Sequence, residues 1–146
     1  MSMSNASETN LLNLLFNNVD WPNVGDAAGL QNSATAGSFY VALHTTDPAD
    51  AGNQTTNEIA YTGYARVAVA RSAGGFTVSG ANVSNAATVQ FGECTAGSAS
   101  AGFFSVGLSP TGVGDILYSG SLSAVRAISA GITPLFNPGA LAGTVD

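Results

Sequence analysis

The chain has 146 residues, with nine acidic side chains, three arginines and no lysine, and its formal net charge is −6. Charged residues make up 8% of the chain against roughly 25% in ordinary soluble domains, so we expect much of the surface to meet other subunits. Because nucleic acids and anionic membranes are both bound through clustered cations, this composition argues against either as a partner.

One amphipathic helix is predicted near the N-terminus, over about residues 6–18. Asn5 and Glu8 have the form of a capping box, and Pro22 and Gly25 end the pattern. The apolar stripe predicts either a helix packed on the protein's own sheet or an arm that docks on a neighbouring subunit. The residues that would anchor such an arm are Leu12, Leu15, Phe16 and Val19.

Short extended runs dominate the rest of the chain. Residues 31–37 are small and polar and form a linker, which divides the chain into a helical arm and linker (1–35) and a β-sandwich domain (36–146). The first predicted strand is 38–44, where apolar residues alternate, and a long polar loop follows it at 45–57. The later predicted strands are 65–70, 76–79, 82–84, 87–91, 102–108, 115–119, 122–128 and 141–145.

The hairpin formed by 102–108 and 115–119 is the predicted centre of this domain. Its turn, 109–114, is rich in Gly and Pro, and apolar residues stand on both faces of both strands, which is typical of central strands. A second turn at 73–75 predicts that 76–79 pairs back on 65–70. Eight or nine short strands without intervening helices predict an all-β fold, an antiparallel β-sandwich or jelly roll. The expected core residues are Phe39, Val41, Leu43, Val67, Val69, Val89, Phe91, Phe104, Val106, Leu117 and Val125.

Few residues could carry chemistry. His44 is the single histidine and Cys94 the single cysteine, so they cannot complete a structural zinc site, and we interpret both as structural residues. The oxygen-rich segment 47–53, with Glu58 nearby, could offer some ligands to Ca²⁺, but its residues are also ordinary turn formers. We therefore expect no catalytic residues, no metal and no cofactor. The likeliest polar contacts to a partner are Asp47 and Asp50 in the loop, together with Arg66 and Arg71.

Four segments resemble one family of proteins. They are the runs 39–48, 57–69, 116–122 and 136–141. The first of them, 39–48, reads Phe-Tyr-Val-Ala-Leu-His-Thr-Thr-Asp-Pro. Together they are similar to small structural proteins of tailed bacteriophages, which are usually labelled tail fibre or virion proteins. In size and strand pattern the chain also resembles capsid cement (decoration) proteins of jelly-roll type. The shared motifs are turn and strand sequences, so the resemblance implies a virion protein and brings no catalytic residues.

The resemblance and the composition together favour a structural role in the virion. The leading prediction is a cement protein on the outer surface of the capsid, a dimer or trimer that binds the major capsid protein and lies in the host cytoplasm during assembly. The alternative is a tail fibre or tail-tip protein that takes part in host adsorption. A glycan-active enzyme is the third and least favoured reading, because no catalytic constellation can be identified in the sequence.

Overall fold

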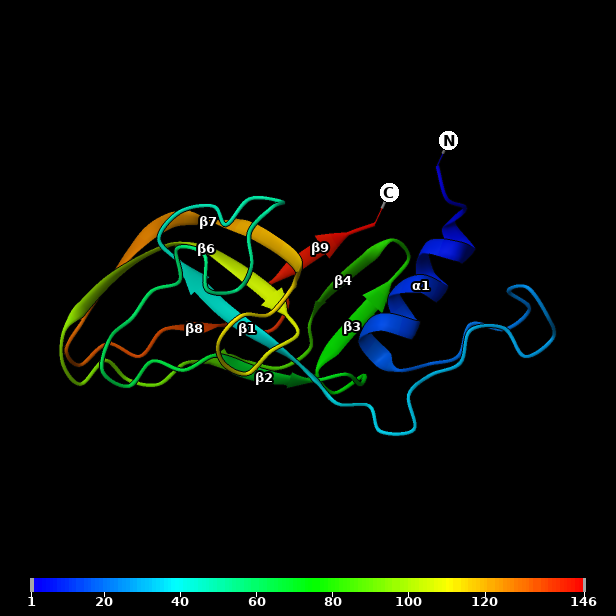
Figure 1. The fold of residues 1–146 in the computed structure, drawn as a ribbon, viewed down its shortest axis with the longest axis horizontal. Coiled ribbons are helices and arrows are strands. Elements are labelled where there is room, and N and C mark those ends of the chain that lie inside the picture. The colour runs from blue at the N-terminus through cyan, green and yellow to red at the C-terminus, as the bar shows by residue number, and fades with distance from the viewer. Residues whose placement is uncertain (1, 146) are drawn as a thin grey trace. The chain divides into compact units, whose positions relative to one another are not determined.

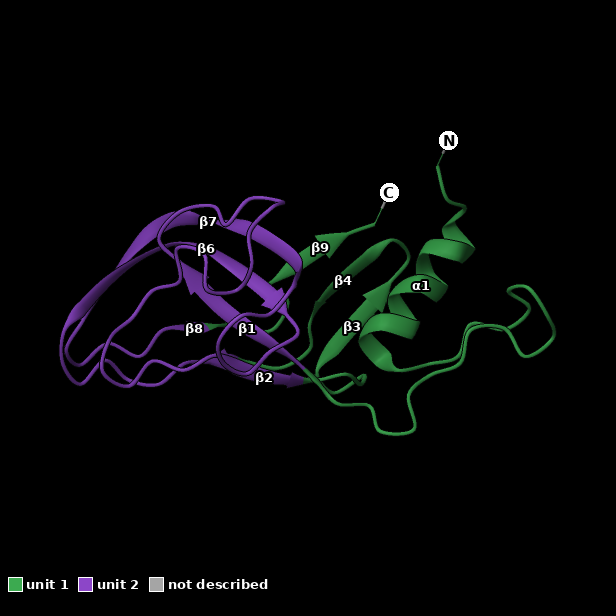
Figure 2. Cartoon of the chain, viewed as in Figure 1, with its two compact units in different colours: residues 1–38, 70–88, 136–146 green, residues 39–69, 89–135 purple. Residues whose placement is uncertain are grey.

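The computed structural model describes residues 2–145, which are mostly β-structure with one helix near the N-terminus (Figure 1). The pairs β1–β6, β3–β4, β4–β9 and β6–β7 are all antiparallel, which confirms the predicted all-β, antiparallel class and is consistent with a β-sandwich. Chain contacts divide the protein into two compact units (Figure 2). Unit 1 comprises residues 1–38, 70–88 and 136–146, and unit 2 comprises 39–69 and 89–135. No helix in the described range is long and apolar enough to cross a membrane.

Unit 2 contains a four-stranded sheet with the order β2-β1-β6-β7 (Figure 1). Its strands are β1 (Ser38–His44), β2 (Val67–Ala70), β6 (Ser98–Gly107) and β7 (Ile116–Ser129). A short pair, β5 (Val89–Gln90) and β8 (Leu135–Phe136), lies outside this sheet.

Strand β1 has the predicted bounds and lies inside the sheet. It pairs with β6 from Tyr40 opposite Gly107 to His44 opposite Phe103, and every residue from Val41 to His44 is buried. The alternation of apolar residues predicted one buried face, whereas the structure covers both faces of this part of the strand.

The predicted central hairpin exists, but only one of its strands is central. Strand β6 lies between β1 and β7, whereas β7 is the edge of the sheet. The two strands predicted at 115–119 and 122–128 are one continuous strand, most of whose residues are exposed or half-buried. Val125, predicted to be core, is 68% exposed, and this prediction is wrong because apolar alternation does not distinguish a central strand from an edge strand.

Unit 1 combines the helix with a three-stranded sheet of order β3-β4-β9. Its elements are α1 (Asn5–Asn17), β3 (Phe76–Ser79), β4 (Asn82–Asn85) and β9 (Ala142–Thr144). The predicted capping box is displaced by one residue: Ser4 is the N-cap, and its Oγ accepts a hydrogen bond from the backbone N–H of Ser7. Asn18, in the left-handed conformation, ends the helix.

The predicted pairing of 76–79 with 65–70 is wrong. Strand β3 pairs with β4 from Phe76 opposite Asn85 to Ser79 opposite Asn82, and β2 instead belongs to the sheet of unit 2. The connection is the two-residue turn at Gly80, which has φ 60° and so suits a tight hairpin.

The remaining core follows the sequence closely. Seven of the other predicted core residues are buried, and Val67, Phe104 and Leu117 are half-buried. The seven buried residues are Phe39, Val41, Leu43, Val69, Val89, Phe91 and Val106.

The units group the chain differently from the predicted division into residues 1–35 and 36–146, because α1 shares unit 1 with β3 and β4.

Candidate functional site

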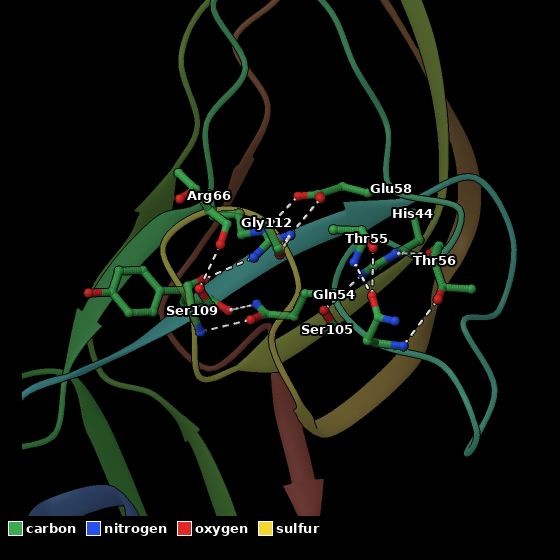
Figure 3. A network of polar contacts seen from close by, with 12 residues as sticks. His44, Gln54, Thr55, Thr56, Glu58, Arg66, Ser105, Ser109 and Gly112 are labelled. Atoms are coloured by element: carbon green, nitrogen blue, oxygen red, sulfur yellow. Dashed lines mark hydrogen bonds and ion pairs between the residues drawn. The ribbon is translucent and has the colours of Figure 1, made fainter.

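A polar network in unit 2 joins strand β1 to the two loops 45–57 and 108–115 (Figure 3). The second loop is the turn of the β6–β7 hairpin. Both loops consist largely of small polar residues, so their conformation depends on hydrogen bonds from side chains that project from neighbouring segments. Three such side chains, His44, Gln54 and Arg66, hold the two loops.

His44, the last residue of β1, is fully buried and has a partner on each ring nitrogen. Its Nδ1 lies 2.8 Å from the carbonyl oxygen of Thr56, which can only accept, so Nδ1 carries the proton. Its Nε2, 2.8 Å from Oγ of Ser105, then accepts the hydroxyl proton. Burial lowers the pKa of His44 below its ordinary value, so the neutral ring is the form that suits this network.

The contact between Ser105 and His44 has the length found in a nucleophile–base pair. However, the Ser105 side chain points from β6 into the interior and is 0% exposed. A substrate cannot reach its oxygen without the sheet opening. We therefore interpret the pair as a link between β1, β6 and the 45–57 loop, which fits the structural role predicted for His44.

Gln54 connects the two loops through its buried side chain. Its Nε2 donates to the carbonyl oxygen of Tyr40 at 3.1 Å, and its Oε1 accepts from the backbone N–H of Ser109 at 2.9 Å. The backbone N–H of Gln54 donates to the carbonyl of Gly114 at 2.8 Å. Glycine is needed at Gly107 and Gly114, since a Cβ at either would overlap the Gln54 side chain.

Arg66 holds the turn of the β6–β7 hairpin from its other side. Its Nε and Nη2 donate to the two carboxylate oxygens of Glu58 at 2.8 and 2.7 Å, a bidentate pair. Nη1 and Nη2 also donate to the carbonyl oxygens of Ser109 and Gly112 at 3.0 and 2.8 Å. The side chains of Arg66 and Glu58 are only 3% and 16% exposed, so this predicted contact residue serves the protein's own loop.

Tyr64 completes the network beside β1. Its hydroxyl donates to Oε1 of Glu58 at 2.9 Å and accepts from the backbone N–H of Leu43 at 3.1 Å. Burial, with the nearby Glu58 charge, raises the pKa of Tyr64 well above its ordinary value. The hydroxyl therefore keeps its proton and remains a donor to the carboxylate at neutral pH.

The predicted loop residues Asp47 and Asp50 are both exposed. Oδ1 of Asp47 accepts from the backbone N–H of Ala49 at 2.9 Å, and Oδ1 of Asn53 accepts from the N–H and hydroxyl of Thr55, so these oxygens cap turns. No group of three or more His, Cys, Asp or Glu side chains among the described residues could hold a metal ion.

Arg71 belongs to unit 1 and is not part of the network described for unit 2. Its Nε and Nη2 donate to the carbonyl oxygens of Leu15 and Leu14 at 2.6 and 2.9 Å, and its Nη1 to that of Ala36 at 3.1 Å. A cation thus satisfies the free carbonyls at the C-terminal end of α1, where the helix itself has no basic residue. The guanidinium is engaged internally and not displayed to a partner.

The four predicted helix anchors divide between core and surface. Leu12 and Phe16 are buried in unit 1, and the ring of Phe16 lies edge-on against Phe76 of β3 with 4.9 Å between centroids. Leu15 is half-buried, and Val19 is 50% exposed. The stripe therefore packs mainly on the protein's own sheet, the first of the two alternatives that the sequence left open.

No motif or spacing indicated Gln54 or the contact between His44 and Ser105. For Glu58 and Arg66 the signal was the scarcity of charged residues in the chain, because a buried charge needs a partner of opposite sign.

The network is suited to fixing the conformation of the loops that it joins. It presents the exposed apolar side chains of Leu108 and Val113, which are 48% and 75% exposed, on a turn whose backbone is fixed from both sides.

The chain is similar to a known protein family. A family model described as "Podophage GP4 fiber I protein gp80" matches residues 2–144, nearly the whole chain. No curated protein sequence matches significantly. The matched range extends over both units, so it includes α1 and the loops of the polar network as well as the β-strands.

Proposed function

Because the chain belongs to the family of the podophage GP4 fiber I protein gp80, a family of phage virion structural proteins, we propose that it is a component of a tail fibre. In this role it contributes to host adsorption by presenting fixed loops at the particle surface. The observation that carries the proposal is the family match over residues 2–144, whose description names a fibre.

The polar network supports a binding role for the hairpin turn. Recognition surfaces are commonly loops held by a rigid scaffold. Arg66 donates to two carbonyls of the turn and Gln54 bonds its backbone at Ser109 and Gly114. A turn held in this way loses little conformational entropy on binding, so exposed side chains such as Val113 could contact a receptor or a neighbouring fibre protein efficiently.

The same features support a role that does not involve catalysis. The Ser105–His44 pair lies in the interior, and the exposed carboxylate of Asp47 caps a turn. We therefore propose that the protein acts through contacts with other proteins or with the host surface, and that it is not an enzyme. Incubation of the purified protein with host surface glycans, followed by analysis of released sugars, tests this part of the proposal.

The alternative location is the head, with the major capsid protein as partner. The sequence-based argument for it combined the low charge and the resemblance in size and strand pattern to cement proteins with a helical arm as an anchor. In the structure two of the four anchor side chains, Leu12 and Phe16, are covered within unit 1, so the arm gives this location less support.

The experiment that separates the two locations compares wild-type particles with particles that lack this protein. We expect density for the protein on the tail, normal thermal stability of the heads, and reduced adsorption to host cells. Purified protein added back should restore adsorption. Density over capsomer junctions, with heads that rupture at a lower temperature and adsorption unchanged, would establish the cement role instead.

A further inference from the structure

Residues 18–35, between α1 and β1, form an arm that is almost entirely exposed. Asn18, Trp21 and Gly29 are half-buried, and every other residue of the arm is exposed. In Figure 1 the arm extends from the C-terminal end of α1 away from β3 and β4 of the same unit. Its surface is therefore open to a partner.

Hydrogen bonds within the arm fix its shape although it buries little. The backbones of Trp21 and Leu30 exchange two hydrogen bonds of 2.9 Å, which form a short antiparallel bridge. The Asn18 side chain donates to the carbonyl oxygen of Ser33 at 2.8 Å and accepts from its N–H at 2.9 Å. Ordering a backbone costs conformational entropy, which an exposed segment recovers poorly by burial, and compact ordered surface loops are frequently functional.

The arm presents apolar side chains beside negative charge. Val19, Val24 and Leu30 are exposed, and the arm contains two carboxylates, Asp20 and Asp26, and no cation. Oδ1 of each carboxylate accepts backbone N–H groups of the arm, whereas Oδ2 has no partner among the described residues. A surface that complements the arm therefore offers an apolar contact next to a positive charge.

Such a surface is found on this chain itself, at the bulge of β7 in unit 2. The register between β6 and β7 shifts at Gly102, and residues 122–125 of β7 lie opposite this one residue. Val125 and Arg126 are both exposed at this point, which we call the β7 bulge. Because β7 is the last strand of its sheet, a partner on its open side can contact side chains of either face.

Arg126 is the cation that is available to a partner. Arg66 and Arg71 donate to acceptors within the protein, whereas Arg126 makes no hydrogen bond or ion pair with any described residue. Two copies of a chain with a formal charge of −6 repel each other. They therefore associate most readily through a contact that joins this cation to a carboxylate, and the arm supplies carboxylates together with apolar side chains.

We propose that the arm of one copy of this chain docks on the β7 bulge of a second copy. The carboxylates of the arm lie against Arg126, and Val24 and Leu30 pack on Val125. Because the arm and the bulge are different surfaces, the contact is heterologous, and each copy both offers an arm and receives one. Repetition of the contact about an axis closes a ring, of which the reciprocal dimer is the smallest. The proposal goes beyond the proposed function and does not depend on it, because a protein that stays monomeric in solution would leave the fibre assignment intact.

Two variants of the full chain with opposite defects test this contact. The arm variant carries Val24→Asp and Leu30→Asp, and the bulge variant carries Val125→Asp and Arg126→Asp. In sedimentation velocity at about 100 μM, where even a weak specific interface is populated, the parent protein should be a closed oligomer. Each variant should have a dissociation constant raised about tenfold or more.

An equimolar mixture of the two variants gives the decisive measurement. The bulge variant keeps an intact arm and the arm variant keeps an intact bulge, so the mixture should form a dimer that neither variant forms alone. An isologous interface cannot give this rescue, since both of its halves are the same surface.

Two further sets of variants serve as controls, and circular dichroism confirms that each is folded. Ile132→Asp with Leu135→Asp adds the same two charges as the arm variant at exposed apolar positions outside both surfaces, and it should associate like the parent. Asp20→Asn with Asp26→Asn keeps the acceptor oxygens that shape the arm and removes only the charges. It should weaken association severalfold in the parent and have little further effect in an Arg126→Gln background.

Four results would overturn the proposal. The first is a parent protein that stays monomeric at this concentration. The second is an arm or bulge variant that associates like the parent. The third is a mixture of the two variants that stays monomeric. The fourth is a control with Ile132→Asp and Leu135→Asp that dissociates the oligomer as strongly as the arm variant does.

Discussion

Replacement of Arg66 by alanine should destabilise the protein severely although the residue belongs to a loop-holding network and not to the apolar core. The substitution removes four hydrogen bonds, two to the carboxylate of Glu58 and two to the carbonyls of Ser109 and Gly112. Loss of one partner from a buried ion pair costs about 3–5 kcal/mol, because the other charge is left without compensation. Glu58 is 16% exposed and can recruit some water, so we expect the lower half of that range, about 3–4 kcal/mol.

The assay is urea denaturation followed by circular dichroism at one fixed protein concentration, with the free energy of unfolding obtained by linear extrapolation. Arg126→Ala is the matched control, since it removes an exposed arginine without a partner among the described residues, and it should change the monomer's free energy by no more than about 0.5 kcal/mol. If Arg66→Ala costs less than about 1 kcal/mol, or no more than its control, then the network does not fix the turn as we have argued.

Three further predictions address other parts of the structure. Burial lowers the folded-state pKa of His44 below its ordinary value of 6.5, so the contribution of the neutral ring to stability is fully present above pH 6.5 and is lost as the pH falls toward the folded pKa. Between pH 7.5 and pH 5 the free energy of unfolding should therefore fall less steeply in His44→Gln than in the parent protein. Equal slopes would contradict this reasoning. Phe16→Ala should lower the free energy of unfolding by about 3–5 kcal/mol in urea denaturation, whereas a freely extended helical arm would lose almost nothing. Gly107→Ala should lower the free energy of unfolding by about 1–3 kcal/mol in thermal denaturation, because the new Cβ would lie 2.6 Å from the carbonyl oxygen of Asp115. The control Gly74→Ala, whose Cβ would lie 3.7 Å from its nearest neighbour, should be nearly neutral. Similar melting temperatures for the two variants would show that the turn tolerates the methyl group.

The sequence predicted those parts of the fold that depend on local pattern. The bounds of β1 were predicted correctly because Phe39, Val41 and Leu43 alternate strongly and the neighbouring loop is polar. The partner of β3 was predicted incorrectly, since turn-forming residues flank the strand on both sides and the shorter connection, at Gly80, forms the hairpin. Alternation also could not show that β7 is an edge strand, because period-two pattern reports the two faces of a strand and not whether its sides are paired.

The site was less predictable for a physical reason. Arg66 and Arg71 were chosen as partner contacts because arginine favours paired interfaces, but in each case the nearest suitable acceptors lie within the chain. Arg71 satisfies helix carbonyls more than fifty residues earlier in the sequence, a distance over which no spacing rule applies. Gln54 carries no charge and belongs to no motif, so only its three-dimensional position shows that it joins two loops.

The construction of unit 1 from three separate segments has a consequence for how the chain acquires its structure. β9 pairs with β4 from Ser84 opposite Ala142 to Asn82 opposite Thr144, and the buried side chain of Asn85 bonds the backbone at Asn137 and Leu141. On the ribosome, α1 therefore emerges first but cannot pack until β3 and β4 have been synthesised, and their sheet is completed only when β9 follows. Such long-range closure makes folding slow and leaves the apolar face of the helix uncovered in the nascent chain. We expect this interval to be the period in which the protein is most prone to aggregation, and a chaperone that binds apolar helices would act there.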